Sequence, residues 1–306
     1  MIALEEWTLA AGTGLLVIGF AYAAVSDWRD REVTDRLWQG LGLLGALLGV
    51  LTVLPGGTFP VLAWLVIAAL TLEHMFSWDD ALGESGSRYA DIFELAAYLA
   101  VGAFVTYALL RVGLGPSGFP VIALAVFVTV VFARVLFELG VLYGGADAKA
   151  LMIAGMLVPL FPQPVLLPGP SVLSVPTFVP FPIDLLMNAA LLSIAIPIGV
   201  ALRNAARGQF TFPKGFTGYS LPVGELPRRY VWVRDPAAPG ARDEEAEIET
   251  SEEDRRHRRA LAEELRARGI RRVWVTPQIP FLVLMALGAV TALLLGNLVV
   301  DLLVLI

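Results

Sequence analysis

Repeated apolar runs of about 18 residues or more constrain this chain more than any other feature of its sequence. Hydrophobic residues fill 57% of its 306 positions. Runs of this length can cross a bilayer as helices, in which every backbone polar group finds a hydrogen-bond partner inside its own segment. The sequence therefore predicts an all-α polytopic membrane protein.

The order of the runs and the charges between them predict about eight transmembrane helices. Three arginines, Arg29, Arg31 and Arg36, follow the first run, which places its end in the cytoplasm and the N-terminus outside. Alternation from there puts both termini outside. The expected spans are residues 8–25, 37–54, 60–76, 92–110, 118–142, 148–160, 184–202 and 278–306.

The domain organisation follows from one large polar stretch near the end of the chain. Membrane-embedded helices are expected over residues 1–203, a cytoplasmic polar insertion over 204–275 and a final transmembrane helix over 276–306. Two further connections are interpreted as loops. They are the polar stretch Ser77–Asp91 and the proline-rich stretch Phe161–Pro182, which cannot form a regular helix.

The insertion is expected to have a small mixed α/β fold or to be partly disordered. Short strands are predicted at Phe210–Phe212 and at Arg229–Val233, where apolar and polar residues alternate. The acidic run Asp243–Asp254 is typical of a solvated or disordered segment. Arg255–Arg268 is predicted to be a charged helix. The last span should then open with Thr276 as N-cap and Pro277 at the first helical position.

Composition narrows the chemistry that the chain could perform. It contains no cysteine, which excludes disulfides, thiol nucleophiles and zinc-thiolate sites. Its two histidines, His74 and His257, are far apart, which argues against a histidine-rich metal site. We therefore expect neither a metal nor a cofactor.

Two aspartates lie where apolar runs meet the cytoplasmic face. Asp27 ends the first run, and Asp147 follows Gly144 and Gly145 at a junction between two others. A charge near hydrocarbon must be paired, hydrated or functional. When two carboxylates come close, one keeps its proton while the other stays ionised, which is the arrangement of aspartic proteases. The glycines would let a backbone or a substrate approach, although tight helix packing would also require them.

These residues resemble motifs of the prepilin peptidases, including the archaeal preflagellin peptidases. Asp27-x-x-x-Arg31-Glu32-Val33-Thr34-Asp35 resembles the first aspartate motif of that family, and Gly144-Gly145-Ala146-Asp147-Ala148-Lys149 resembles the second, Gly-x-Gly-Asp-x-Lys. Trp274–Phe281 resembles the segment that opens the last helix of the archaeal members. The chain departs from the family in having Ala146 for the second glycine, Thr34-Asp35 for the usual Pro-Asn, and a longer separation between the aspartates.

The resemblance implies an aspartic endopeptidase of the plasma membrane, with its active site at the cytoplasmic face. Its substrates would be pilin-like or archaellin precursors, which are cut just before their hydrophobic helix. Asp27 and Asp147 would be catalytic, supported by Gly144, Gly145, Lys149 and Arg31. Expected partners are membrane lipid and these precursors, with no nucleic acid. The oligomeric state, monomer or homo-oligomer, stays open.

Neighbouring charges offer alternatives to this assignment. Asp30 and Asp35 compete with Asp27, but both lie farther past the apolar run and should be more solvated. Arg31 either pairs with Asp27 or anchors to lipid phosphate, and we favour anchoring. Lys149 is interpreted as an interfacial anchor or electrostatic tuner rather than a base.

Other functions were weighed against the peptidase. Residues 83–86 spell Gly-Glu-Ser-Gly, an intramembrane serine protease pattern, but they fall in the predicted polar loop and His74 lacks a matching helix context. An ion-coupled transporter could use Asp27 and Asp147 as a proton relay, although transporters usually show repeated halves and carboxylates at midplane depth. A non-enzymatic scaffold would explain the insertion but not the two aspartates.

Overall fold

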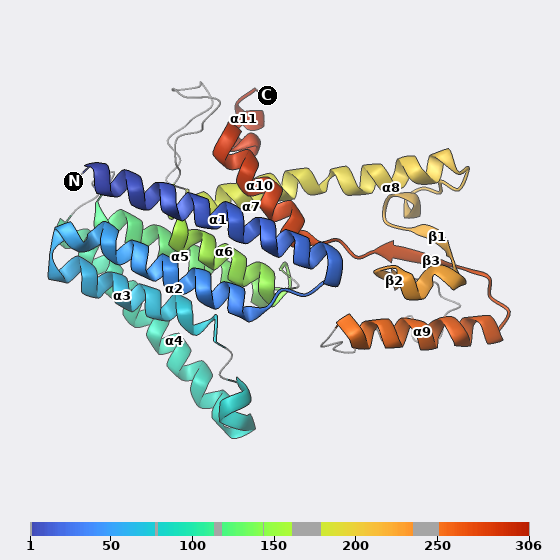
Figure 1. Cartoon of the computed structure of the whole chain (residues 1–306), viewed down its shortest axis with the longest axis horizontal. Helices are drawn as coiled ribbons and strands as arrows, with labels where there is room; N and C mark the ends of the chain where they lie inside the picture. The colour runs from blue at the N-terminus through green and yellow to red at the C-terminus, as the bar shows by residue number, and fades with distance from the viewer. Residues whose placement is uncertain are drawn as a thin grey trace. The chain divides into compact units, whose positions relative to one another are not determined.

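The computed structural model describes residues 2–76, 79–112, 118–142, 144–160, 179–234 and 251–305. These residues are predominantly helical (Figure 1). The chain divides into two compact units. The first unit comprises Met1–Val25, Val33–Leu191 and Phe281–Ile306, and the second comprises Ser26–Glu32 and Leu192–Pro280.

The first unit is a bundle of apolar helices. In it, α6 packs against α5 and α2, and α2 also packs against α3. The helices are α1 Ile2–Asp30, α2 Asp35–Val53, α3 Thr58–Glu73, α4 Asp79–Val112, α5 Phe119–Glu138, α6 Gly145–Leu157, α7 Phe181–Ser193, α10 Phe281–Leu295 and α11 Leu298–Leu305, with a 3₁₀ turn at Leu54–Gly56.

Glycines let these helices approach closely. A Cβ atom at Gly49 would stand 1.8 Å from Cε2 of Trp64, so the indole lies directly against the backbone of α2. Trp64 also donates its indole N–H to the carbonyl of Ala46 at 2.8 Å. A Cβ at Gly12 would stand 2.2 Å from the carbonyl oxygen of Leu157, which brings α1 against the end of α6. Close packing around small residues is a main source of helix association in membranes.

This contact yields a stability prediction. Gly49→Ala should lower the free energy of unfolding by about 1–3 kcal/mol, because the methyl group must displace the Trp64 indole. The control is Gly40→Ala in the same helix, where a Cβ would meet nothing within 4 Å. Denaturant titration in detergent measures the free energy of unfolding of both variants. Equal stability of the two variants would contradict the packing described here.

Five helical stretches are long and apolar enough to cross a membrane, so the eight predicted crossings are not confirmed. Two shorter apolar helices, α3 and α10, fall below this length, and α6 has only 13 residues. Within the described residues, the qualifying stretches are Glu6–Asp30, Asp35–Gly56, Glu94–Arg111, Phe119–Glu138 and Phe181–Ala206.

Two predictions about element boundaries in this unit are wrong. The polar stretch Ser77–Asp91 is helical from Asp79, where α4 begins. The last span does not open at Thr276-Pro277, which belong to a strand, and α10 begins at Phe281. The proline-rich stretch lies outside the described residues between 161 and 178.

The last span is also interrupted. Gly296, with φ of 98°, and Asn297 separate α10 from α11, which begins at Leu298. The side-chain oxygen of Asn297 accepts the backbone N–H groups of Val299 and Val300, both at 3.0 Å, so it satisfies donors at the start of α11.

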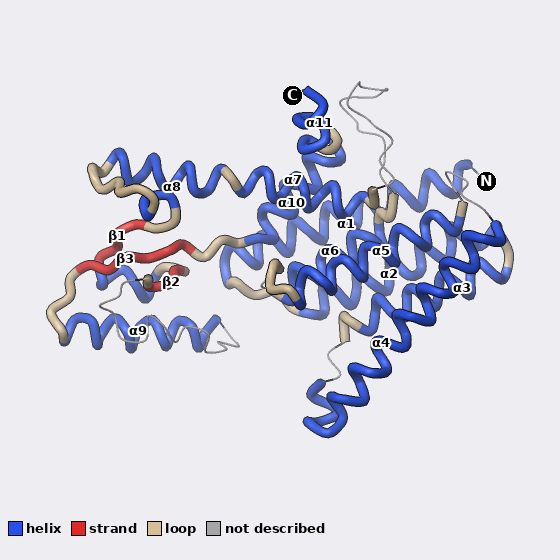
Figure 2. The backbone as a smooth tube through the Cα atoms, turned by 180° about the vertical axis from the view of Figure 1, so that it is seen from behind, coloured by secondary structure: helices blue, strands red, loops and turns tan. Residues whose placement is uncertain are grey.

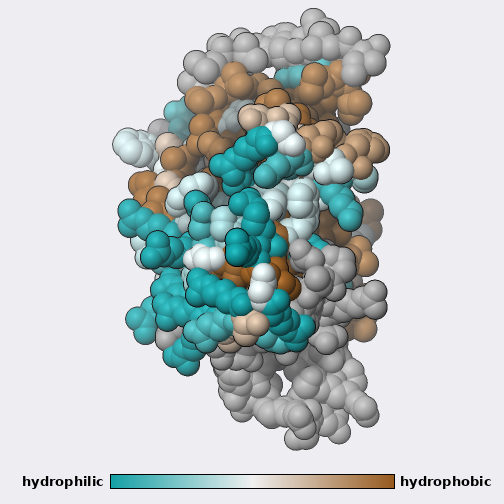
Figure 3. Space-filling view, turned by 90° about the vertical axis from the view of Figure 1, so that its right-hand side faces the viewer, coloured by the Kyte–Doolittle hydropathy of each residue, from teal (hydrophilic) through white to brown (hydrophobic). Residues whose placement is uncertain are grey.

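The second unit combines a short antiparallel sheet with helices (Figure 2). Its strands are in the order β1-β3-β2, with Tyr219 opposite Val275 and Val231 opposite Pro277. Hydrophilic side chains gather on the face turned to the viewer in Figure 3. The elements are α8 Ala195–Ala206, β1 Tyr219–Pro222, β2 Val231–Val233, α9 Ser251–Ala267 and β3 Arg272–Pro277, with 3₁₀ helices at Lys214–Phe216 and Val223–Arg228.

The core of this unit confirms part of what the sequence predicted for it. Leu261 and Leu265 of α9, four residues apart on one side of the helix, are buried with the inward residues of the strands. Arg229–Val233 contains β2, whose burial alternates. The predicted strand at Phe210–Phe212 is wrong, because both phenylalanines pack edge-on against Phe216 instead. Of the acidic run, residues 243–250 lie outside the described part of the chain.

Candidate active site

The second aspartate motif forms the start of α6. Gly144 is the N-cap, and Asp147 lies in the first helical turn, where the helix dipole favours a negative charge. A Cβ at Gly144 would stand 2.9 Å from Oδ2 of Asp147, so the carboxylate folds back over this glycine. A Cβ at Gly145 would meet nothing within 4 Å. Gly144 therefore makes room for the carboxylate of Asp147.

Ala146 replaces the family's second glycine without backbone strain. It lies within α6, and its φ is not positive. Because an α-helical conformation suits alanine well, the greater conformational freedom of glycine is not needed at this position.

An ion pair joins the two motifs inside the first unit. Nζ of Lys149 lies 2.6 Å from Oδ1 of Asp35, the first residue of α2. A Cβ at Gly42 or at Gly45 of α2 would contact Ile153 or Met156, each at 3.1 Å, so α2 and α6 run in the same direction. The start of α2 and the start of α6 therefore lie at the same end of the bundle. The sequence predicted Lys149 as an anchor or tuner and did not predict this partner.

The first aspartate motif is divided between the units, because residues 27–32 belong to the second unit and Asp35 belongs to the first. Asp27 lies in the last turn of α1 and is half-buried, whereas Asp30 and Asp35 are exposed, as the sequence predicted. Since Asp147 belongs to the first unit, the approach of Asp27 to Asp147 stays a prediction.

Arg31 follows the end of α1 in a left-handed conformation, with φ of 60°. Its guanidinium lies 5.1 Å from the centroid of the Tyr230 ring. The expected contact of Arg31 with lipid phosphate stays a prediction. Burial lowers the pKa of Arg31 below its ordinary value. Asp27 opposes this shift in the pKa of Arg31, and Arg258 adds to it.

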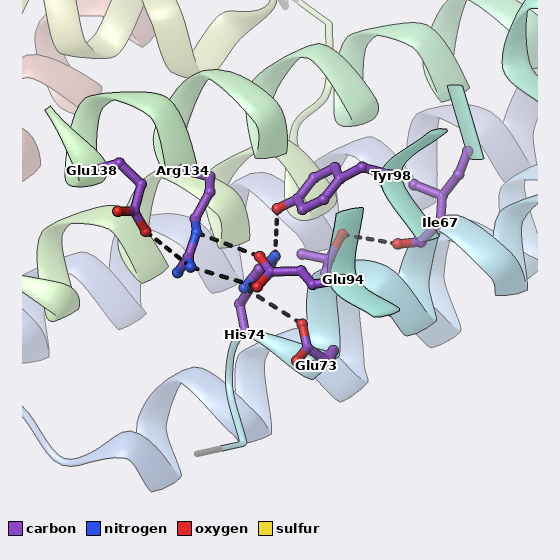
Figure 4. A network of polar contacts seen from close by, with 8 residues as sticks. Ile67, Glu73, His74, Glu94, Tyr98, Arg134 and Glu138 are labelled. Atoms are coloured by element: carbon purple, nitrogen blue, oxygen red, sulfur yellow. Dashed lines mark hydrogen bonds and ion pairs between the residues drawn. The ribbon is translucent and has the colours of Figure 1, made fainter. Parts of the chain in front are cut away.

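A polar network that the sequence analysis missed connects α3, α4 and α5 (Figure 4). Nε2 of His74 lies 2.6 Å from the hydroxyl of Tyr98, and its Nδ1 lies 3.5 Å from Glu73. Arg134 pairs with Glu94 at 3.4 Å. Polar groups at membrane helices are expensive to leave unpaired, which accounts for this clustering.

Part of this network could have been found from sequence. Arg134 also pairs with Glu138 at 2.9 Å, four residues later in the same helix, and that spacing is recognisable. The contact of Arg134 with Glu94 could not have been found from the sequence, because it depends on how α4 packs against α5.

The serine protease pattern lies in a helix and not in the predicted loop, and neither histidine is placed to act as its base. Residues 83–86 lie in helix α4 rather than in the predicted loop. His74 is engaged by Tyr98 and Glu73, while His257 is exposed on α9. Among the residues that the structure describes, no group of three or more His, Asp or Glu side chains is arranged to hold a metal ion.

A second missed network bridges the break between α10 and α11. Asp184 and Asn188 of α7 are fully buried, and Asn297 donates to Asp184 Oδ1. Asn188 donates to the carbonyl of Gly296 at 2.9 Å and accepts the N–H of Leu298 at 2.9 Å. These bonds replace those that the interrupted helix cannot make, as required for irregular backbone in an apolar region.

Two comparisons with known proteins decide the relationship. A family model described as Archaeal Peptidase A24 C-terminus Type II matches residues 212–298. A preflagellin peptidase of Methanocaldococcus jannaschii is 28% identical over 171 residues, which cover 54% of this chain and 67% of that protein. The chain is related to the archaeal preflagellin and prepilin peptidases.

The family match covers most of the polar segment. The matched residues 212–298 include all three strands, α9 and α10. They also include Trp274–Phe281, the third stretch that resembles the archaeal members. The polar segment is therefore part of what this chain shares with archaeal peptidases.

Proposed function

We propose that the protein is a membrane aspartyl endopeptidase that removes the leader peptide from pilin-like or archaellin precursors. Asp27 and Asp147 are its catalytic pair, at the cytoplasmic face of a multi-pass membrane protein. The relationship to a preflagellin peptidase supports the substrate class.

The ion pair between Lys149 and Asp35 carries this proposal. Lys149 is the last residue of the second motif and Asp35 is the last residue of the first, so their contact brings together two segments 114 positions apart. Asp147 precedes Lys149 by two residues, and Asp27 precedes Asp35 by eight. An ion pair whose aspartate is half-exposed adds at most about 1 kcal/mol to the free energy of unfolding. We therefore assign to this pair the role of holding the two motifs together.

The proposed reaction needs only the two carboxyl groups and water. The ionised carboxylate takes a proton from a water molecule, whose oxygen attacks the carbonyl carbon of the scissile peptide. The protonated partner donates a hydrogen bond to the carbonyl oxygen as negative charge develops there. The nitrogen of the leaving segment then receives a proton as the C–N bond breaks.

The bilayer placement is supported by the surface of the helices. Large apolar side chains that face outward include Ile18 of α1, Leu47 of α2 and Leu110 of α4, which are 70%, 55% and 82% exposed. Exposed leucine and isoleucine of this extent suit contact with lipid chains. Arg29, Arg31 and Arg36 assign the motif end of α1 to the cytoplasmic side.

The test is precursor cleavage by the protein reconstituted in lipid vesicles. We expect a pilin- or archaellin-like precursor to be cut next to its hydrophobic helix, with no metal or cofactor added and with EDTA present. A transport assay on the same vesicles addresses the alternative function. Proton-coupled solute uptake without cleavage of any precursor would replace the peptidase with a transporter that uses the two aspartates as a proton relay.

A further inference from the structure

Tyr230 connects the end of α1 to the sheet of the second unit. The guanidinium carbons of Arg31 and Arg258 lie 5.1 and 4.9 Å from the centroid of its ring. Its hydroxyl donates to the backbone carbonyl of Arg29 at 3.2 Å. Its own carbonyl accepts the N–H of Gln278 at 3.0 Å, which fixes its backbone beside the end of β3. Tyr230 is therefore held by the sheet and in turn contacts the last turn of α1.

Arg31 occupies an environment that needs such a partner. A left-handed conformation is uncommon for residues other than glycine and persists where the surroundings impose it. Among the described residues, its buried Nε and Nη1 atoms have no hydrogen-bond partner. The face of a tyrosine ring attracts a guanidinium and compensates in part for lost hydration. The contact with Tyr230 thus favours an Arg31 conformation that would otherwise be expensive.

Arg31 is tied directly to the turn that carries Asp27. The backbone N–H of Arg31 donates to the carbonyl of Asp27 at 3.2 Å. The hydroxyl of Ser26 donates to the carbonyl of Glu32 at 2.7 Å and closes the same segment from the other side. Because one backbone hydrogen bond joins the two residues, a displacement of Arg31 would also displace the turn that carries Asp27.

We infer that Tyr230 is a positioning residue for the peptidase reaction. Through Arg31 and the carbonyl of Arg29, it fixes the turn of α1 that presents Asp27. The inference rests on the proposed function, in which Asp27 is catalytic. The polar segment of residues 204–275 thereby supplies the residue that holds the turn of the first aspartate.

Tyr230→Leu tests the inference by removing both the ring and the hydroxyl. We expect kcat for precursor cleavage to fall roughly 10²-fold with KM changed less than about twofold, because a catalytic group displaced by about 1 Å loses this much. Tyr230→Phe keeps the ring and loses only the bond to Arg29, so kcat should fall roughly three- to tenfold. The matched control is Trp232→Leu, two residues along, whose side chain is 43% exposed. It should leave kcat unchanged.

A spectroscopic readout separates positioning from loss of folding. The chain has no cysteine, so Trp28→Cys, at a position 66% exposed, carries a single nitroxide next to Asp27. Its electron paramagnetic resonance spectrum should show increased mobility with Tyr230→Leu, a smaller increase with Tyr230→Phe and no increase with Trp232→Leu. An unchanged kcat in Tyr230→Leu overturns the inference, whether or not the nitroxide becomes mobile. Where Tyr230→Leu does not fold, an unchanged kcat in Tyr230→Phe overturns it.

Asp27→Asn, assayed in parallel, distinguishes failure of the positioning role of Tyr230 from failure of the proposed function. An active Asp27→Asn enzyme would reject the catalytic role of Asp27, whatever Tyr230 does. An inactive Asp27→Asn enzyme together with a fully active Tyr230→Leu enzyme would reject only the positioning role.

Discussion

Asp27→Asn and Asp147→Asn should each lower the rate of precursor cleavage by roughly 10³-fold or more, because each removes a carboxyl group through which protons must move. Asparagine preserves the shape of the side chain, so the variants should insert and fold as the parent does. Single-turnover cleavage of a pilin- or archaellin-like precursor in lipid vesicles measures the effect, with thermal unfolding in detergent as the check on folding.

The double variant and two neighbouring aspartates provide the controls. Residues that act as one unit are not additive, so Asp27→Asn/Asp147→Asn should be about as slow as either single variant. Asp30→Asn should retain substantial activity, since its side chain is exposed. Asp35→Asn removes the carboxylate that pairs with Lys149, so it should lower activity, but less than either catalytic substitution. Cleavage that survives Asp147→Asn would exclude the aspartyl mechanism.

Gly144→Ala should reduce kcat roughly 10²-fold, although it adds only one methyl group. The new Cβ would stand 2.9 Å from Oδ2 of Asp147 and 3.4 Å from its Cγ, closer than ordinary contacts allow, so the carboxylate must move. The backbone itself tolerates alanine, because φ of Gly144 is −97°. Kinetics with saturating precursor separate this loss of kcat from a change in KM.

Gly145→Ala is the matched control for this prediction. It adds the same methyl group one residue later, where a Cβ would meet nothing within 4 Å and where α6 has already begun. We expect activity within about twofold of the parent and slightly higher stability, because alanine suits a helix better than glycine. Equal losses in the two variants would mean that the motif tolerates no side chain for a reason other than the position of Asp147.

Local patterns were sufficient to predict much of this architecture. The apolar runs located helices that could cross a bilayer, and the charged stretch Arg255–Arg268 located most of α9. The alternation around Val231 located β2. Each of these features depends on residues within a few positions of one another, where helix and strand periodicity are directly readable.

Boundaries set by distant partners were not predictable in this way. Thr276-Pro277 has the sequence of a helix start, yet it pairs with Val231 and Trp232 as the end of β3. The break at Gly296 depends on Asn188, more than 100 positions earlier. In the candidate site, the motifs identified Asp27, Asp147 and Lys149, but the pairing of Lys149 with Asp35 required the packing of α2 against α6.

The hydrogen bond between Tyr230 and Arg29 has a consequence for biosynthesis, because it joins residues 201 positions apart. At about 5–20 residues per second, the ribosome needs roughly ten to forty seconds to reach the tyrosine after it has made the arginine. During that interval the first helix can enter the membrane, but the turn that carries Asp27 has not yet met its partner. A nascent chain released before Tyr230 would carry both aspartates in its sequence and yet lack the contact that fixes the first of them. The order of synthesis thus delays this contact until Tyr230, in the last third of the chain, has emerged.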